Sequence, residues 1–467
     1  MSLWSIAWKS LKQRWLASSL TGFSVALGIA LMVLVLIING VFTRMFSQNS
    51  VGYDLVIGPK GSEWQLVLNT IFRVDRALND MPWRYYEQLK EDPDFREVIP
   101  FAVADVTSEG QFPIVATIPR FFSVPYAYNR SFGIPDDGES TFLRGTWDAV
   151  VGSEVARKNG WKVGSTFQLL HSGTGEDAHI HDEKFTVVGV LAPTGTANDR
   201  TAFIHIDGFF LLDEHGGTVD SNVEREMLWF QESKEQIEQR YSEVIPKMRA
   251  EEERKARAEA EGRHYHSHLA PSVLTKRISA ALVVMRGSPD RPNMDEINRS
   301  TQAAAKAAEL RETFAAQGVQ PFGVMYEIQD KLIGNVNLAL LVLTVVIVIV
   351  SGIGIFVSIY NSMSDRRRQI AILRALGAPR SSVFLVILFE SLILCVGGCL
   401  VGLLIGHGLV FIASPILEAR SGFLVDPFSF ERAELYLIPA LAVMATLVGF
   451  LPGMTAYRTD VAQSLSE

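Results

Sequence analysis

The chain alternates between long apolar runs and one long polar region. One apolar run lies near the start of the 467 residues and three lie near the end. Each is close to the roughly 20 residues that a helix needs to cross a bilayer. We therefore predict a membrane protein with four transmembrane helices in a 1+3 arrangement, with a large extracytoplasmic domain inserted after the first. The predicted spans are residues 16–43, 333–362, 383–413 and 435–457.

Basic residues near the spans predict the orientation. Residues 1–15 carry Trp4, Trp8 and Trp15 on one helical face and basic residues on the others, which is typical of a helix lying in the inner membrane interface. Five arginines lie within residues 363–382, between the second and third spans, and such loops favour the cytoplasmic side. Both termini are therefore predicted to be cytoplasmic, with residues 44–332 and the short loop 414–434 outside and the tail 458–467 inside.

The arginine-rich segment 363–382 has the pattern of a short amphipathic helix. Its apolar residues recur at helical spacing, and a glycine and a proline follow where the helix should end. We expect this row of guanidinium groups to bind an acidic groove of another protein. The alternative is that these arginines only fix the membrane topology and bind lipid phosphate. The residues assigned to partner contact are Arg366, Arg367, Arg368, Ile370, Leu373, Arg374, Leu376, Gly377 and Arg380.

The third predicted span carries a stripe of small residues. Gly398, Gly402 and Gly406 lie four residues apart, so they share one face of a helix and would let another helix approach closely. Glu390 lies in the same span, where an ionisable group normally faces protein or water. A hydrogen bond to a neighbouring helix is its expected use.

The region between the first and second spans reads as a folded α/β domain. Short strand-like runs alternate with helical ones, and residues 145–215 are rich in period-2 and β-branched runs, which predicts a small β-rich subdomain. Residues 224–263 form a charged helical arm, interpreted as a solvated helix or a mobile arm in preference to a dedicated partner-binding arm.

Composition excludes several classes of protein. The net charge of −8 and a pI near 5.7 argue against nucleic acid as the partner. The two cysteines, Cys395 and Cys399, both lie in the third span, so the extracytoplasmic domain has no disulfide framework. No G-x-S-x-G or H-E-x-x-H motif is present, and no catalytic residue is assigned.

Histidines of the extracytoplasmic domain raise the question of zinc. His179 and His181 alternate in HIH, and His264, His266 and His268 alternate in HYHSH. In a strand, alternating side chains point the same way and could present nitrogens to Zn²⁺. Exposed polar loops are the alternative and the preferred interpretation. Metal-linked binding or sensing outside the membrane therefore stays a second functional hypothesis.

Several segments resemble one transporter family. The most specific is RRRQIAILRALGAPRSSV (366–383), which resembles the coupling-helix signature of MacB/FtsX-type ABC transporter permeases, also called type VII. The segments FESLIL (389–394), PGMTAYRTDVAQSL (452–465) and VVGSEVARKNGWKVGSTFQL (150–169) are similar to other parts of that family. The segment from 54 to 75, DLVIGPKGSEWQLVLNTIFRVD, resembles a subset whose permease is encoded apart from its ATPase.

The resemblance implies a non-catalytic permease subunit in a bacterial inner membrane, arranged like the LolC/LolE permeases. The chain contains no G-x-x-x-x-G-K-[ST], so ATP and Mg²⁺ are expected on a separate cytoplasmic ATPase. A second permease copy, as a homodimer, and a periplasmic protein, peptide or lipoprotein are the other implied partners, together with membrane lipid. ATP hydrolysis would drive a conformational change in the periplasm. An ATPase-independent receptor or anchor is the remaining alternative.

Overall fold

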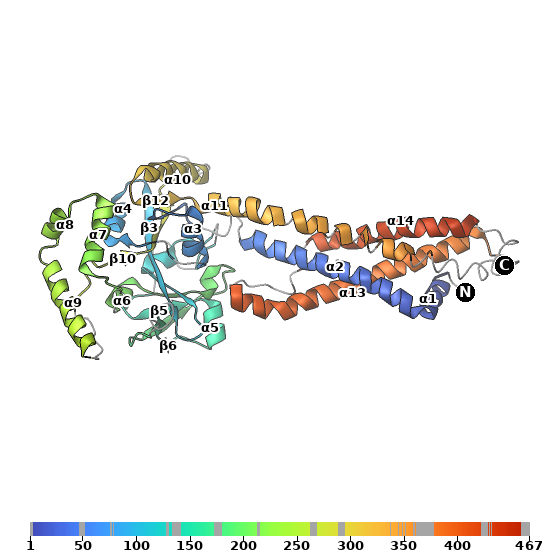
Figure 1. The fold of residues 1–467 in the computed structure, drawn as a ribbon, viewed down its shortest axis with the longest axis horizontal. Coiled ribbons are helices and arrows are strands. Elements are labelled where there is room, and N and C mark those ends of the chain that lie inside the picture. Colours follow the sequence, from blue (N-terminus) through green and yellow to red (C-terminus); the bar gives the residue numbers. More distant parts are fainter. Residues whose placement is uncertain are drawn as a thin grey trace. The chain divides into compact units, whose positions relative to one another are not determined.

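The computed structural model divides into two compact units. Residues Met1–Arg44 and Gln329–Glu467 form the first, called here the helical unit, and Met45–Ile328 form the second, the sheet unit. Figure 1 shows the helices of the first and the mixed helices and strands of the second. The structure describes residues 3–45, 52–74, 77, 79–127, 130–132, 142–171, 180–212, 215–261, 269–287, 295–336, 338–343, 345–347, 349–350, 352–357, 360, 378–421, 428, 430 and 432–458.

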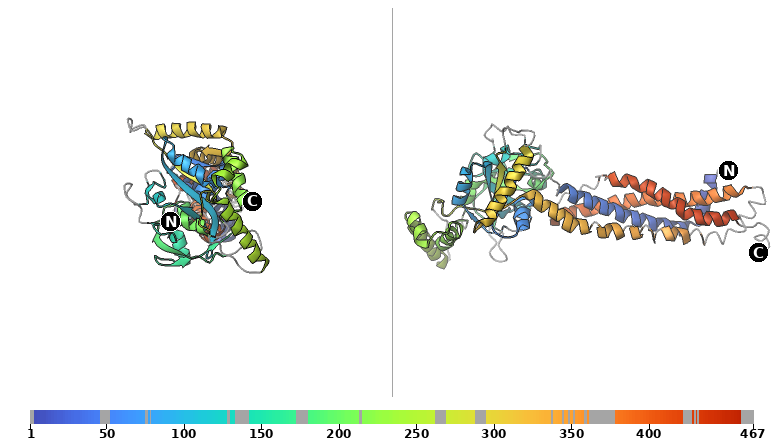
Figure 2. Two further views of the ribbon diagram at one scale, coloured as in Figure 1. Left: turned by 90° about the vertical axis from the view of Figure 1, so that its left-hand side faces the viewer. Right: turned by 90° about the horizontal axis from the view of Figure 1, so that it is seen from above.

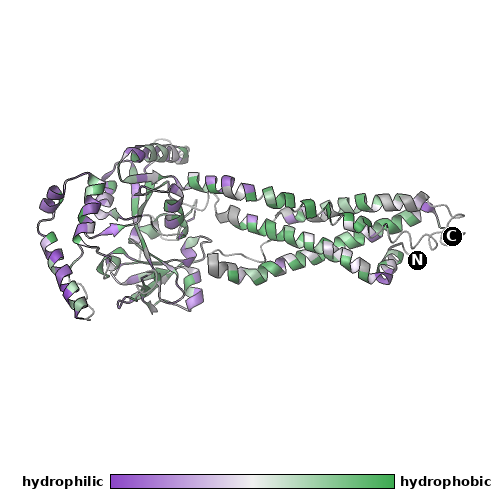
Figure 3. Cartoon of the chain, in the orientation of Figure 1, coloured by the Kyte–Doolittle hydropathy of each residue, from purple (hydrophilic) through white to green (hydrophobic). Residues whose placement is uncertain are grey.

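The helical unit is built from long apolar helices (Figure 3). Three helices of the described chain are long and apolar enough to cross a membrane, over Ser18–Val41, Leu338–Val357 and Arg380–Ile416. They belong to α2 (Trp15–Met45), the helix that follows residue 334, and α13 (Arg380–Ser421). The helix α14 (Leu437–Arg458) covers the fourth predicted span but is not among the three, so a total of four stays a prediction.

The helices of this unit run beside one another. α13 packs along α14 (Figures 1 and 2), and α1 (Leu3–Gln13) packs on α13, where the Trp4 and Phe389 rings meet edge to face at 6.1 Å. A 3₁₀ turn, η7 (Arg432–Tyr436), leads into α14. α13 continues to Ser421 with Pro415 inside it, past residue 413 where the sequence placed the end of the span.

The described residues of the sheet unit form a sheet of ten strands, in the order β12-β1-β11-β3-β4-β9-β5-β8-β6, with β7 paired to β3. β3 is the longest strand: it pairs with β11 along one part and with β4 and β7 along the other, with a shift of register between Val103 and Val106. The β4–β9 and β5–β8 pairs are parallel. The strands are β1 (Leu55–Pro59), β3 (Phe95–Thr107), β4 (Pro113–Thr117), β5 (Asp148–Val151), β6 (Thr166–Phe167), β7 (Leu169–Leu170), β8 (Phe185–Val190), β9 (Ala202–His205), β11 (Ala280–Met285) and β12 (Ala316–Val319).

Helices and short turns complete this unit, which confirms the predicted α/β class. A separate two-stranded pair joins β2 (Met81–Pro82) to β10 (Arg277–Ile278). The residues predicted as a β-rich subdomain supply β5 to β9, and these strands join the same sheet through β3 and β4. The helices are α3 (Glu63–Phe72), α4 (Trp83–Glu91), η2 (Pro119–Ser123), α5 (Ser153–Asn159), η4 (Ala197–Arg200), α6 (Ile206–Leu211), α7 (Val219–Phe230), α8 (Lys234–Arg240), α9 (Ile245–Ala260), α10 (Asp295–Glu312) and α11 (Pro321–Glu327). The π-helical η6 (Ile328–Gly334) begins at the last residue of this unit and continues into the helical unit.

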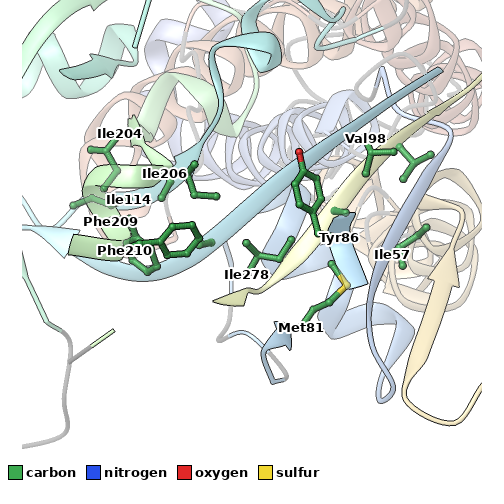
Figure 4. Packing of buried hydrophobic residues seen from close by; sticks show 14 of the residues in the cluster. Ile57, Met81, Tyr86, Val98, Ile114, Ile204, Ile206, Phe209, Phe210 and Ile278 are labelled. Atoms are coloured by element: carbon green, nitrogen blue, oxygen red, sulfur yellow. The ribbon is translucent and has the colours of Figure 1, made fainter. Parts of the chain in front are cut away.

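The main hydrophobic core lies between the sheet and the helices that pack on it. Figure 4 shows part of it, where Phe209 and Phe210 of α6 lie near Ile204 of β9 and Ile114 of β4. Burying such side chains supplies about 1.5–3 kcal/mol each. This core fixes α6 on β9, and therefore also positions the connection that follows α6.

The charged arm predicted for residues 224–263 is folded into α7, α8 and α9, which share a smaller core of their own. Two of these helices begin at a capping box. Thr218 and Ser221 form a capping box at the start of α7, and Ser233 and Gln236 form another at the start of α8. Such boxes satisfy two backbone N–H groups that a helix start leaves without partners. Local sequence therefore explains where α7 and α8 begin.

Candidate metal centre

Three histidines and one aspartate of the sheet unit converge on one point. Asp105 lies near the end of β3, His171 directly follows β7, His181 precedes β8, and His215 lies in the connection between α6 and α7. One nitrogen from each histidine and one carboxylate oxygen all lie within 4.8 Å of one another. Residues separated by more than one hundred positions in the chain thus form a single cluster.

Strand register explains how Asp105 and His171 meet. The antiparallel β3–β7 ladder pairs Val106 with Leu170. In an antiparallel pair, the residue before one partner faces the residue after the other. The two neighbours are Asp105 and His171, and their side chains are joined by an Oδ1–Nδ1 contact of 2.9 Å.

The two other histidines are held by backbone and ring contacts. The N–H of His181 donates to the carbonyl of Leu169 at 2.9 Å, and the Gln168 side-chain amide donates to the carbonyl of His181 at 2.9 Å. The ring of His215 packs on Phe209, with 4.2 Å between ring centroids. His181 is therefore fixed to β7, and His215 is fixed to the main core through α6.

Three of the four side chains in the cluster are buried. The side chains of Asp105, His181 and His215 expose 3% or less of their surface, whereas that of His171 exposes 33%. His215 Nε2 and His181 Nε2 lie 3.0 Å and 3.6 Å from Asp105 Oδ2. Within the described residues, neither Asp105 Oδ2 nor His215 Nε2 makes a hydrogen bond of acceptable geometry. A buried polar atom without such a bond is costly, so this arrangement needs a physical reason.

The electrostatics of the cluster favour a charged carboxylate. Burial alone would raise the pKa of Asp105, but its contacts with the imidazoles of His171 and His215 outweigh burial and hold the pKa well below its usual range. An ionised carboxylate beside three imidazoles supplies oxygen and nitrogen donors at one point. These are the donor types that bind borderline divalent metals such as Zn²⁺.

Sequence reasoning found only one member of this cluster. His181 was a predicted metal residue and lies in the cluster. The other predicted metal residues, His179, His264, His266 and His268, lie outside the described residues. Asp105, His171 and His215 were missed. The only signal was weak: each is a lone His or Asp in the extracytoplasmic domain.

The predicted ATPase-coupling residues lie mostly outside the described chain. This applies to Arg366, Arg367, Arg368, Ile370, Leu373, Arg374, Leu376 and Gly377. Arg380 is described. It begins α13, and its guanidinium carbon lies 5.9 Å from the ring centroid of Tyr457, near the end of α14. The start of α13 and the end of α14 therefore lie at the same end of the helical unit.

Three glycines of α13 lie where another helix approaches closely. A Cβ at Gly402 would lie 2.6 Å from the Ala26 carbonyl oxygen, and one at Gly398 would lie 2.9 Å from Val25 Cβ. A Cβ at Gly406 would meet Val33 at 2.9 Å. All three glycines therefore face α2, and we call this contact the glycine seam. Glu390 of the same helix is buried.

Two family models match the chain. A MacB-like periplasmic core domain matches residues 18–240, and an FtsX-like permease C-terminal domain matches residues 341–461. Among curated proteins, the ABC transporter permease YtrF of Bacillus subtilis is 32% identical over 128 residues, which is 25% of this chain and 29% of that protein. A macrolide export ATP-binding/permease protein MacB of Bordetella avium is 26% identical over 176 residues, which is 36% of this chain and 26% of that protein.

Among solved structures, the periplasmic region of MacB from Actinobacillus actinomycetemcomitans is similar to part of this chain. It aligns at 10% identity and a TM-score of 0.31, over 61% of this chain and 97% of that chain. The alignments to the two curated relatives span less than a third of the length of each relative. The two family models match successive parts of the chain, as expected from the resemblance of its segments. The chain therefore belongs to the MacB/FtsX-type permeases of ABC transporters, membrane proteins with a periplasmic domain.

Proposed function

We propose that this chain is a permease subunit that transmits force. A separate cytoplasmic ATPase would hydrolyse ATP with Mg²⁺, and the permease would pass the resulting motion to its periplasmic domain. Two copies of the permease would act together as a homodimer in a bacterial inner membrane, with both termini in the cytoplasm. The work would be done on a lipoprotein, a peptide or another molecule already in the periplasm. The chain itself would catalyse no reaction.

The observation that carries the proposal is the order of the two matches along one chain. The MacB-like periplasmic core lies in the first half, and the FtsX-like permease region includes the arginine-rich segment 363–382 between two apolar runs. The 467 residues contain no phosphate-binding G-x-x-x-x-G-K-[ST] motif. The proposal therefore assigns nucleotide hydrolysis to a partner, to which the arginine-rich segment would offer a basic, amphipathic contact.

The helical unit offers a mechanical route for such motion. The arginine-rich segment leads directly into α13, because Arg380 is the first residue of that helix. α13 contacts α2 through the glycine seam. The two helices pack so closely there that these positions of α13 place no flexible side chain between them, so a movement of α13 would also move α2. α2 ends at Met45, where the chain passes into the sheet unit. A push on segment 363–382 would therefore reach α2 through close packing.

The apolar character of the spans supports transmission of force in preference to passage of a polar solute. The described spans are strongly apolar along their length. A hydrophilic route through a membrane is normally lined with polar or charged side chains. Force transmission needs only rigid helices and does not require such a lining.

The proposal is tested by reversing two charges of the segment. The double variant Arg367→Glu/Arg374→Glu replaces two guanidinium groups by carboxylates, which an acidic partner groove would repel. The full-length permease is expressed with its ATPase, and the ATPase recovered with the permease from detergent extracts is quantified. We expect wild type to retain the ATPase and the double variant to lose nearly all of it.

A matched control reverses two arginines elsewhere. Arg254 and Arg257 lie on α9 of the sheet unit, so Arg254→Glu/Arg257→Glu makes the same change of charge at a surface predicted to be periplasmic. This variant should retain the ATPase at the wild-type level. Equal retention by the two double variants would contradict the coupling role, and a wild-type protein that works without any ATPase would favour the receptor or anchor alternative.

A further inference from the structure

We propose that Asp105, His171, His181 and His215 form a four-donor site for a Zn²⁺-class divalent transition metal in the periplasmic domain. Nothing in the similarity to transporter permeases assigns a metal to this chain. The inference does not depend on the coupling role, because all four residues lie within the sheet unit. It also differs from the hypothesis drawn from the sequence. That hypothesis placed zinc on the alternating histidines of two segments, where exposed polar loops without zinc were the preferred interpretation.

The spacing of the donor atoms fits a tetrahedral centre. Zn²⁺ binds imidazole nitrogen and carboxylate oxygen at about 2.0–2.2 Å, which places tetrahedral donors ~3.4 Å apart. The nitrogens of His171, His181 and His215 lie 2.9, 3.6 and 3.0 Å from Asp105 oxygens, and all four donors lie within 4.8 Å of one another. Binding would therefore need side-chain shifts of under about an ångström, with no rearrangement of the strands.

Burial distinguishes this cluster from an ordinary polar surface. Three of the side chains are at least 97% buried, and Asp105 Oδ2 and His215 Nε2 lack well-formed hydrogen bonds within the described chain. A cation between these two atoms would satisfy both. His171, whose side chain is one third exposed, leaves a route from solvent.

The donor set selects the class of metal. Three imidazoles and one carboxylate suit Zn²⁺ and its neighbours Co²⁺, Ni²⁺ and Cu²⁺, and disfavour Mg²⁺ and Ca²⁺, which prefer all-oxygen sites. No thiolate can take part, because both cysteines of the chain lie in α13 of the helical unit. Four protein donors fill a tetrahedral shell, so this is a binding site without the open position that a hydrolytic zinc centre keeps.

Metal binding would fasten two connections to the sheet. His171 and His181 flank the segment between β7 and β8, and His215 belongs to the connection between α6 and α7. Each would be bonded through the metal to Asp105 on β3. Because the unfolded chain does not hold these donors together, binding would stabilise the folded sheet unit.

The test uses the full-length permease in detergent, carrying an affinity tag without histidine. The protein is treated with a chelator, exchanged into metal-free buffer and titrated with Zn²⁺ against a chromophoric competitor. We expect one tightly bound equivalent and a higher thermal unfolding midpoint with Zn²⁺. The variant Asp105→Asn/His215→Gln should lose at least about 100-fold in affinity, because removing direct ligands exceeds the loss seen for their supporting groups.

The matched control removes the histidines that the sequence singled out. The variant His264→Gln/His266→Gln/His268→Gln loses three imidazoles, whereas Asp105→Asn/His215→Gln loses one imidazole and one carboxylate. The triple variant should keep the tight equivalent. Retention of tight binding by Asp105→Asn/His215→Gln, or its loss in the triple variant alone, would overturn the assignment. A wild-type protein that takes up no tight Zn²⁺ would overturn it as well.

Two measurements keep the test decisive if the double variant fails to fold. His171→Gln alters the most exposed ligand, and the glutamine amide can still donate a hydrogen bond to Asp105. It should therefore lower the metal-free unfolding midpoint less than Asp105→Asn/His215→Gln does, while weakening Zn²⁺ binding. Wild-type protein loaded with Co²⁺ should show the intense visible bands of a four-coordinate ion, without a thiolate charge-transfer band. Weak bands of a six-coordinate ion, or unaltered Zn²⁺ affinity in His171→Gln, would contradict the proposed donor set.

Discussion

The helical unit and the sheet unit hold their elements together in different ways. α13 approaches α2 at three glycines, and the atoms closest to them are backbone oxygens and aliphatic carbons. The sheet unit has a large apolar core and buries more acidic side chains than the helical unit, where Glu390 and Glu434 are the buried acids among the described residues. Arg84 of α4, for example, contacts Glu226 of α7 and Glu232 at 3.0–3.2 Å, and the Glu226 side chain is fully buried.

The difference follows from the solvent that surrounds each unit. In lipid, an apolar side chain gains little by leaving the bilayer for a helix interface, so association depends on how closely helices can pack. In water, apolar burial drives folding and can sustain buried ionic groups that have partners. Adding a methyl group should therefore damage the helical unit most, and removing an ionic partner should damage the sheet unit most.

The largest effect is expected from Arg84→Met in the sheet unit. Burial already raises the pKa of Glu226, and Arg84 supplies its hydrogen bond and nearest positive charge. Removing the guanidinium leaves a buried carboxylate without that partner, which costs about 3–5 kcal/mol. We expect a matching fall in the free energy of unfolding, measured by denaturant unfolding of the full-length protein in detergent.

Two further variants sharpen this prediction. Glu226→Gln in the Arg84→Met background removes the isolated charge and should recover part of the lost stability. Arg254→Met breaks an exposed pair with Glu251, where the arginine exposes 66% of its side chain, and should change stability by at most about 1 kcal/mol. Equal effects of Arg84→Met and Arg254→Met would show that the buried pair is not special.

The next effect is expected from Gly402→Ala in the glycine seam. The new methyl carbon would lie 2.6 Å from both the Ala26 carbonyl oxygen and Ile29 Cβ, so α2 and α13 must move apart. Overpacking of this kind costs about 1–3 kcal/mol. The expected result is a lower thermal unfolding midpoint of the full-length protein in detergent.

Another glycine of the same helix supplies the control. Gly408→Ala makes the same change where, in the described part of the chain, no atom outside the local helix backbone lies within 4 Å of the new carbon. Alanine favours helix by up to about 1 kcal/mol over glycine in water, so this variant should be neutral or slightly stabilising. If both variants behave alike, close approach of the two helices does not determine the stability of this unit.

The helical unit was the easier of the two to predict from the sequence. A glycine every fourth residue is a local pattern, and helical periodicity alone places Gly398, Gly402 and Gly406 on one face. The facing residues on α2 could not be predicted, because the pattern carries no information about which helix packs there. The structure supplies Val25, Ala26, Ile29 and Val33 as the contacts.

The candidate metal centre could not be predicted for the opposite reason. Its four residues come from four separate places in the chain, and they meet only because β7 pairs with β3 and because α6 is fixed on β9. β7 has only two residues, too few for a period-2 pattern to reveal. The pattern of alternating histidines in the sequence includes His181 but none of the other three residues of the cluster.

The smallest effect concerns the acid stability of the sheet unit. Side-chain hydrogen bonds from Arg240 and Arg84 lower the pKa of Glu232 from 4.5 to about 2. A depressed pKa contributes stability above the pKa of the unfolded state, and this contribution is lost as the pH falls from about 4.5 through about 2. Glu226 acts in the opposite sense, because burial raises its pKa and its protonation in acid favours the folded state. Glu232 is also one fifth exposed, so the net effect should be modest.

Glu232→Gln isolates this contribution, because it removes the titrating group while keeping its shape. The variant should be less stable than wild type at pH 7 and should lose less stability between pH 4.5 and pH 2, as measured by thermal unfolding over that range. Glu253→Gln, an exposed change on α9, should follow the wild-type profile.

The destabilisation caused by Gly402→Ala should be the same at pH 7 and pH 4, because no ionisable atom is among the nearest neighbours of that position. A pH-dependent effect at the glycine seam would mean that ionisable groups also set the packing of α13 on α2, and the contrast between the two interiors would not hold.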